Sequence, residues 1–294
     1  MFPDGQRLHL QHGPIDMIVQ AEGTVGAISE AYRRAAVRFD GLLQELVDEL
    51  PHLRQPVTPG PSPLSGAVAQ RMWHAAQMHL PQFVTPMAGV AGAGAQAILA
   101  AMVPADGITR AHVNNGGDIA LYLGPGAAPF RLGVVVDPAR PTALGRLAIG
   151  PDSACRGVAT SGAHGRSHSM GIADSVTVLA ADAPAADVAA TLLANAVDLP
   201  GDPAIRRTPA ARLSPDSDLG DRPVTTGIGP LSLAQSARAL DAGEAAAARM
   251  CAQRLILGAV LVLGAQVRIV GEVPGIDAMP HAMDRPRIGK PLHA

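Results

Sequence analysis

Strand-like and helix-like segments follow one another along this sequence without the regular strand–helix–strand spacing of a parallel α/β sheet. Short apolar runs predict strands over residues 14–21, 130–138, 175–182 and 259–270, a turn followed by a strand over 112–123, and strand-like structure with turns over 145–162. Apolar residues at helical spacing predict helices over 23–50, 67–80, 85–103, 184–197 and 230–257, whereas 51–66 and 200–223 have the composition of loops. We therefore expect an α+β fold.

The chain has 294 residues, of which 48% are apolar and 16% charged, so it can build a sizeable core. We expect a single domain over residues 1–271, followed by a flexible tail over 272–294. The two cysteines are far apart and lack metal-ligand spacing, which is typical of reduced thiols in the cytosol. The start of the chain does not have the pattern of a signal peptide, and the apolar run 255–267 is shorter than the roughly 20 residues that span a bilayer. These features predict a cytoplasmic protein with no membrane partner.

Composition also argues against nucleic acid as a partner. Aromatic residues make up only 2% of the chain, the net charge is −2, and there is no run of Lys or Arg. Proteins that bind nucleic acid need basic patches, and those that stack on bases need aromatic side chains. A small-molecule or nucleotide ligand is the better expectation.

The predicted helix 85–103 contains three closely spaced glycines, Gly89, Gly92 and Gly94. Each glycine inside a helix costs about 0.8–1 kcal/mol relative to alanine, so the cluster needs a reason. Close packing against another helix is one reason, and close approach of a ligand to the backbone is the other. This helix and the apolar strand 259–270 could also bury a homo-oligomer interface, although both could equally be core.

The first candidate site is the polar run that leads into the strand ending at Leu123. It consists of Asn114, Asn115, Gly116, Gly117 and Asp118. Paired glycines let the backbone approach a ligand, and the neighbouring amides and carboxylate add hydrogen-bonding groups. The alternative is an ordinary tight turn, because the same dipeptides are common in turns.

A second candidate is the run Thr160, Ser161 and Gly162, with Arg166 in the polar loop that follows. Hydroxyls and a glycine at the end of a strand could bind phosphate, with the guanidinium of Arg166 as a clamp. His164 and His168 of the same loop could take part in acid–base chemistry. The alternative is a solvated loop.

Asp187 and Thr191 form a third candidate. They are four residues apart on a predicted helix and so share one of its faces, where carboxylate and hydroxyl oxygens could hold Mg²⁺. Asp187 could instead simply interact with the dipole at the start of that helix. Asp174, just before the preceding strand, could join the same polar cluster.

The order of these elements resembles the ApbE family, the Mg²⁺-dependent FAD:protein FMN transferases. The matching motifs are the Asn114–Asp118 run, Val158 to Gly162, Ser175 to Val178, and Ala186 to Thr191. The whole chain is most similar to a smaller branch of ApbE-like proteins. The resemblance implies a T-fold-like arrangement of mixed sheets packed with helices.

The resemblance also implies ligands and residue roles. FAD would lie against Asn114 to Asp118 and Thr160 to Gly162, with Mg²⁺ on Asp187 and Thr191, and a protein hydroxyl would accept FMN. His168 or Asp174 would take the proton of that hydroxyl. Two departures count against this activity, since residues 88–97 lack the family's lysine and acid, and no Pro-Thr-Gly follows His168. We therefore expect a flavin-nucleotide transferase or hydrolase, with an enzyme for another small molecule, or a non-catalytic flavin- or nucleotide-binding protein, as alternatives.

Overall fold

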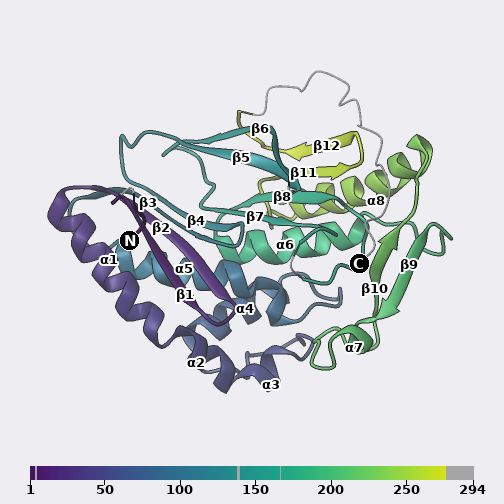
Figure 1. The fold of residues 1–294 in the computed structure, drawn as a ribbon, viewed down its shortest axis with the longest axis horizontal. Coiled ribbons are helices and arrows are strands. Elements are labelled where there is room, and N and C mark those ends of the chain that lie inside the picture. The colour runs from purple at the N-terminus through teal and green to yellow at the C-terminus, as the bar shows by residue number, and fades with distance from the viewer. Residues whose placement is uncertain (4, 138–139, 166, 276–294) are drawn as a thin grey trace.

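A large antiparallel sheet organises the molecule in the computed structural model, which describes residues 1–3, 5–137, 140–165 and 167–275 (Figure 1). Eight strands lie in the order β1-β2-β3-β4-β7-β8-β11-β12. Their bounds are β1 Arg7–His12, β2 Ile15–Gly23, β3 Ile108–Asn115, β4 Asp118–Leu123, β7 Gly157–Ser161, β8 Ser175–Ala180, β11 Gly258–Leu263 and β12 Gln266–Gly271.

Two further strand pairs stand apart from this sheet. One is the hairpin of β5 (Phe130–Asp137) and β6 (Arg140–Ile149), and the other pairs β9 (Ile205–Pro209) with β10 (Pro223–Ile228). All strand pairings among the described residues are antiparallel, where mixed sheets were expected. Short hairpins join β1 to β2, β3 to β4 and β11 to β12, and a hairpin can only connect antiparallel strands. The α+β class is confirmed.

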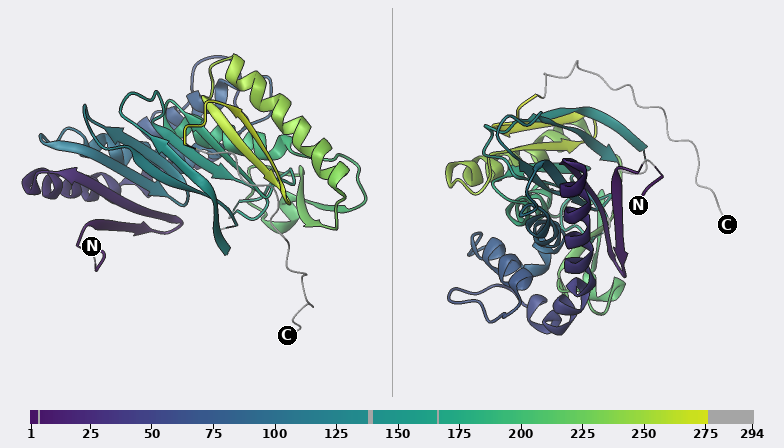
Figure 2. Two further views of the ribbon diagram at one scale, coloured as in Figure 1. Left: turned by 90° about the horizontal axis from the view of Figure 1, so that it is seen from above. Right: turned by 90° about the vertical axis from the view of Figure 1, so that its left-hand side faces the viewer.

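Helices cover one face of the large sheet, and the β5–β6 hairpin covers part of the other (Figure 2). The helices are α1 Val25–Asp40, α2 Leu42–Asp48, α3 Leu50–Leu53, α4 Ala67–Gln77, α5 Val90–Met102, α6 Ala183–Ala196, α7 Ala210–Leu213 and α8 Leu233–Ala252, with a short 3₁₀ turn η1 at Pro86–Gly89. The alternation of side chains along each strand divides the core accordingly. On β8, Val176 and Val178 face the helices, whereas Leu179 faces the hairpin.

Several segments differ from the sequence expectation. The predicted loop 200–223 contains β9 and α7, and the predicted strand 259–270 is a hairpin that turns at Gly264, which has a φ of +64°. The start of the predicted tail is held in place, because the Pro274 carbonyl accepts a hydrogen bond from the Ala148 N–H. Residues 276–294 of that tail lie outside the described residues.

The two cysteines, Cys155 and Cys251, are both free. Among the described residues, no helix is long and apolar enough to cross a membrane.

Candidate functional site

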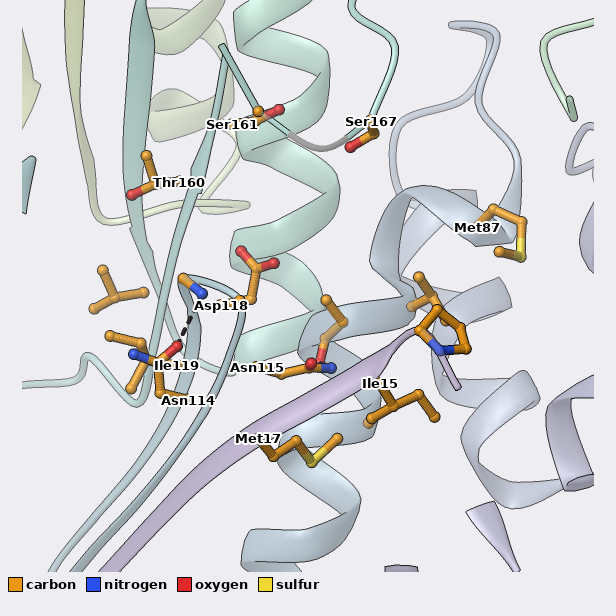
Figure 3. Close-up of a pocket in the computed structure, with 18 of the residues that line it drawn as sticks. Ile15, Met17, Met87, Asn114, Asn115, Asp118, Ile119, Thr160, Ser161 and Ser167 are labelled. Atoms are coloured by element: carbon orange, nitrogen blue, oxygen red, sulfur yellow. Dashed lines mark hydrogen bonds between the residues drawn. The ribbon is translucent and has the colours of Figure 1, made fainter. Parts of the chain in front are cut away.

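A large pocket opens where the β3–β4 turn meets the end of β7, and we call it the central pocket (Figure 3). Its volume is about 1170 Å³. The strands β2 to β4, the helices α2, α3 and α5, the strands β7 and β8 with the loop between them, and the β5–β6 hairpin all contribute to its lining. Two of the three candidate runs of the sequence meet here, although more than forty residues of chain separate them.

The glycine pair is the two-residue turn of the β3–β4 hairpin. Asn115 pairs with Asp118 across the turn, and Gly116 and Gly117 have φ angles of +68° and +115°. Such angles favour glycine, and turns of this kind match the twist of a hairpin. A Cβ added to either glycine would meet nothing within 4 Å, so the open side of the turn faces the pocket. The run Asn114 to Asp118 is therefore a tight turn that also lines the pocket, so the two alternatives for this run do not exclude each other.

The two asparagines fasten this turn to its surroundings. The Asn114 Oδ1 atom accepts a hydrogen bond of 2.8 Å from the Gly117 N–H, drawn as the dashed line in Figure 3. The Asn115 Nδ2 atom donates one of 3.1 Å to the Ala91 carbonyl at the start of α5. The first bond closes the turn itself, and the second fixes the position of the turn against α5.

Asp118, which is half-buried, and Asp187, which is buried, form a carboxyl pair on the helix side of the sheet. Burial raises the pKa of the Asp118 carboxyl group to about 7, and a hydrogen bond from the Thr160 backbone opposes this only in part. Burial and the neighbouring Asp118 raise the pKa of Asp187 well above its usual range. Two carboxyl groups so placed cannot both ionise readily without a nearby positive charge.

Asp187 does not cap its own helix, which corrects the dipole alternative. Asp182 is the N-cap of α6, and its side chain accepts from the Ala185 N–H. The Asp187 Oδ2 atom instead accepts a hydrogen bond of 2.8 Å from the Gly92 N–H in the first turn of α5. Asp187 therefore serves the start of a neighbouring helix, whose first N–H groups lack partners within that helix.

The Thr160–Gly162 run lies at the projecting end of β7. The β4 strand begins at Asp118 and pairs with β7 only at Ile119–Val158 and Ala120–Gly157, so Thr160 and Ser161 extend past the β3–β4 turn. The Thr160 hydroxyl is 2.9 Å from that of Thr177 on β8. A Cβ at Gly162 would lie 2.3 Å from the Asp174 carbonyl, so this glycine permits close packing of the two segments.

Asp174 lines the pocket and is paired with His164. Its Oδ1 atom is 3.1 Å from His164 Nε2, and its Oδ2 atom accepts a hydrogen bond of 2.6 Å from the Gly264 N–H. A carboxylate held from one side and bonded to an imidazole on the other can orient that ring for proton transfer. Both histidines are exposed, but His164 lines the pocket, whereas His168 is not among the described residues that line it.

Two other predicted residues are placed differently. Thr191 is half-buried and, like Asp187, does not line the pocket in the described part of the chain. Arg166 lies outside the described residues. The described part of the chain also contains no group of three or more His, Cys, Asp or Glu side chains that could hold a metal.

An apolar wall forms the helix side of the pocket. The sequence alone does not assign its residues to a site. We call it the helix-side wall, and it consists of Leu42, Leu43, Leu46, Val47, Leu50 and Leu53 of α2 and α3. Ile15 and Met17 of β2 continue it toward the β3–β4 turn (Figure 3). The helical spacing of these residues is also that of ordinary core residues, so the sequence carried no signal that they line a cavity.

The glycines of η1 and the first turns of α5 make two different kinds of contact. A Cβ at Gly92 would lie 2.4 Å from the Ala183 carbonyl, and one at Gly89 would lie 2.9 Å from Val188 Cγ2, both on α6. Gly94 lines the pocket and faces Met17 and Asn115. Close helix packing thus explains two of the glycines, and the third lies at the pocket.

The fold and this pocket define an α+β protein with one large pocket that combines polar strand ends with an apolar wall. A family model described as "AbpE bacteria" matches residues 1–269 of the 294. The chain belongs to this ApbE-like family.

Curated relatives match part of the chain. The UPF0280 protein of Methanothrix thermoacetophila is 37% identical over 158 residues, which cover 53% of this chain and 63% of that protein. The UPF0280 protein of Methanosphaerula palustris is 39% identical over 144 residues, covering 49% of this chain and 56% of that protein. This chain thus spans somewhat more than half the length of these relatives.

Solved structures of similar proteins are distant. The flavin transferase ApbE from Vibrio cholerae is 14% identical, with 90% of this chain and 96% of that chain covered and a TM-score of 0.49. The flavinyl transferase ApbE of Pseudomonas stutzeri is 12% identical, with 92% and 95% covered and a TM-score of 0.48. Family membership rests on the family model.

Proposed function

We propose that the central pocket binds a flavin nucleotide, with FAD as substrate, and that the protein transfers or hydrolyses its FMN part. The observation that carries this proposal is the meeting of a glycine turn, strand-end hydroxyls and the Asp118 carboxyl group at one pocket, with the Asp187 carboxyl group beside Asp118. Its volume of about 1170 Å³ is ample for a dinucleotide, since ligand pockets commonly measure about 300–1,000 Å³. Membership of the ApbE-like family supports the same substrate class.

The carboxyl pair fits a divalent cation. Asp118 and Asp187 lie together with raised pKa values, and a cation beside them would restore both to the charged form. They would supply two oxygen ligands, and Mg²⁺ commonly takes one or two carboxylates and completes its shell with water and phosphate oxygens. When bound, Mg²⁺ would neutralise charge on the pyrophosphate of the substrate. Thr191 lies four residues after Asp187 on the same face of α6, and it stays a predicted ligand of this cation.

His164 and Asp174 would handle the proton of the acceptor hydroxyl. The acceptor oxygen bonds to the phosphorus of the FMN half, the bond from that phosphorus to the bridging oxygen breaks, and AMP leaves with that oxygen. Asp174 holds His164 Nε2, which leaves Nδ1 free to take the proton. The acceptor is a protein Ser or Thr hydroxyl in a transferase and water in a hydrolase.

The helix-side wall supports a second candidate function. It is aliphatic and lacks aromatic side chains that would stack on a flavin ring. This lining, together with the missing lysine of the 88–97 segment, favours a different small molecule with an aliphatic part as the alternative substrate. A cytoplasmic location and a homo-oligomeric state remain predictions under either function.

The experiment that tests the proposal is a titration of the purified protein with FAD, with and without Mg²⁺, followed by an assay for AMP release. We expect tight binding that Mg²⁺ strengthens and slow release of AMP. Asp187→Ala should abolish Mg²⁺-dependent release, because it removes one of the two carboxyl groups. Absence of binding at high micromolar FAD would exclude the flavin substrate and leave the second candidate.

A further inference from the structure

Ser175 carries a buried hydroxyl that no protein group satisfies. Its side chain is 2% exposed, and its Oγ atom has no hydrogen-bond partner among the described residues. Trp73 Nε1 and Arg110 Nε share this condition, but of the three only Ser175 lines the central pocket. Buried hydroxyls in proteins are nearly always paired, so an unpaired one at a pocket indicates a ligand contact.

The direction of this hydroxyl follows from its strand. Side chains alternate along β8, and Val176 and Val178 pack among the helices. Ser175 and Thr177 therefore project to the other face, toward the β5–β6 hairpin. There the Thr177 hydroxyl is already paired with that of Thr160, whereas the Ser175 hydroxyl is not.

The central pocket reaches this face around the tip of the β3–β4 hairpin. Because β4 begins at Asp118 while β7 continues to Ser161, the sheet has a notch beside the turn. The part of the pocket that lies past the notch, which we call the hairpin chamber, is lined by Ile119, Leu132, Leu147, Val158, Thr160 and Ser175. It has apolar walls and hydroxyl groups, and none of these six side chains is charged.

We propose that the hairpin chamber takes the adenine base of the nucleotide, with Ser175 Oγ bonded to the polar edge of that ring. Apolar walls with one neutral hydrogen-bonding group suit a flat heterocycle and not a phosphate. The longer helix-side wall then takes the bulkier ring of the other half, and the phosphates lie between, at the turn. This inference rests on the proposed function, since it assumes a dinucleotide ligand.

The test compares Ser175→Ala with the wild-type protein by calorimetric titration with AMP, FMN and FAD, each with Mg²⁺. We expect the affinity for AMP and FAD to fall about tenfold, because the ring edge loses its partner, and the affinity for FMN to stay the same. The midpoint of thermal unfolding should be unchanged or higher, since the variant removes a buried hydroxyl that has no protein partner.

Thr177→Val is the matched control on the same face of the same strand. Its hydroxyl is already bonded to Thr160, so this variant should lower the unfolding midpoint where Ser175→Ala does not. Unchanged affinity of Ser175→Ala for AMP and FAD would overturn the inference while leaving the proposed function in place. A loss confined to FMN would overturn the placement of the two rings. Failure of the wild-type protein to bind AMP, FMN or FAD would overturn the proposed function, and this inference with it.

Discussion

At the scale of single residues, the raised pKa values of Asp118 and Asp187 make the stability of the folded protein depend on pH. The carboxyl group of Asp118 has a pKa of about 7 in the folded protein, against 3.8 for a free side chain. The folded chain therefore holds a proton that the unfolded chain has lost between these two values. By linkage, this group makes the free energy of unfolding fall as pH rises from about 4 to 7, and the loss persists above pH 7.

Asp118→Asn should remove this dependence. In the absence of divalent cations, we expect the variant to unfold at a higher temperature than the wild-type protein at pH 8, with the difference shrinking at pH 5. Added Mg²⁺ should stabilise the wild-type protein more at pH 8 than at pH 5, because the cation and the proton compete for the same oxygens. Thermal unfolding at both pH values, with Mg²⁺ or EDTA, measures this. Equal pH profiles for the two proteins would show that Asp118 does not titrate in this range.

The two histidines of the 163–174 segment give a second prediction at this scale. His164 is bonded to Asp174 and lines the pocket, whereas His168 does not line it. His164→Gln should slow AMP release from FAD by about 100-fold with little change in FAD affinity, as expected for loss of a proton acceptor. His168→Gln is the matched control and should retain most of the activity. The reverse result would restore His168 to the role that the sequence predicted.

At the scale of elements, the close contact between α5 and α6 places Asp187 beside the first turn of α5. A Cβ added at Gly92 would lie 2.4 Å from the Ala183 carbonyl oxygen, and the Gly92 N–H donates a hydrogen bond to Asp187. Gly92→Ala must push the helices apart, and overpacking of this kind costs about 1–3 kcal/mol of unfolding free energy. Chemical denaturation measures the loss.

Gly26→Ala provides the control for that substitution. Gly26 lies in α1, is exposed, and would place its Cβ in open space. The change should raise the unfolding free energy by roughly 0.5–1 kcal/mol, because alanine is the better helix former. If both variants had the same stability, packing against α6 would not be the reason for Gly92.

Elements also show what the sequence could and could not predict. Helices α1, α4, α5, α6 and α8 carry long periodic patterns, and their existence followed directly from spacing. The sequence predicts a turn over part of strand β3, because the polar end Asn114–Asn115 masks the alternation before it. Strands β9 and β10 were missed because prolines, arginines and threonines dominate a pair that stands outside the main sheet.

The candidate site, too, could be predicted from the sequence only in part. Local motifs identified Asn114 to Asp118, Thr160, Ser161 and Asp174, all of which line one pocket. The sequence does not distinguish His164 from His168, since only the fold brings Asp174, held by the Gly264 N–H, to the side of His164. The pairing of Asp118 with Asp187 could not be read from spacing, because it depends on how α6 packs beside the start of α5.

At the scale of the whole molecule, the segments that could have formed a subunit interface are used within the chain. Helix α5 packs between α1, α6 and the strands β3 and β4, and every residue of β11 is buried between β8 and β12. The homo-oligomer therefore remains a prediction without a surface assigned to it. The pocket is the feature that connects distant parts of the chain.

A ligand that fills both sides of this pocket should protect segments far apart in sequence. The helix-side wall lies on α2 and α3, and the hairpin chamber is closed by β5 and β6. Hydrogen–deuterium exchange with FAD and Mg²⁺ should therefore slow exchange in both 42–53 and 130–134, since opening of either would require the ligand to leave. FMN alone should protect 42–53, and AMP alone should protect 130–134. Protection of the helix segment by all three ligands, with none in the hairpin, would mean that the ligand stays on the helix side of the sheet.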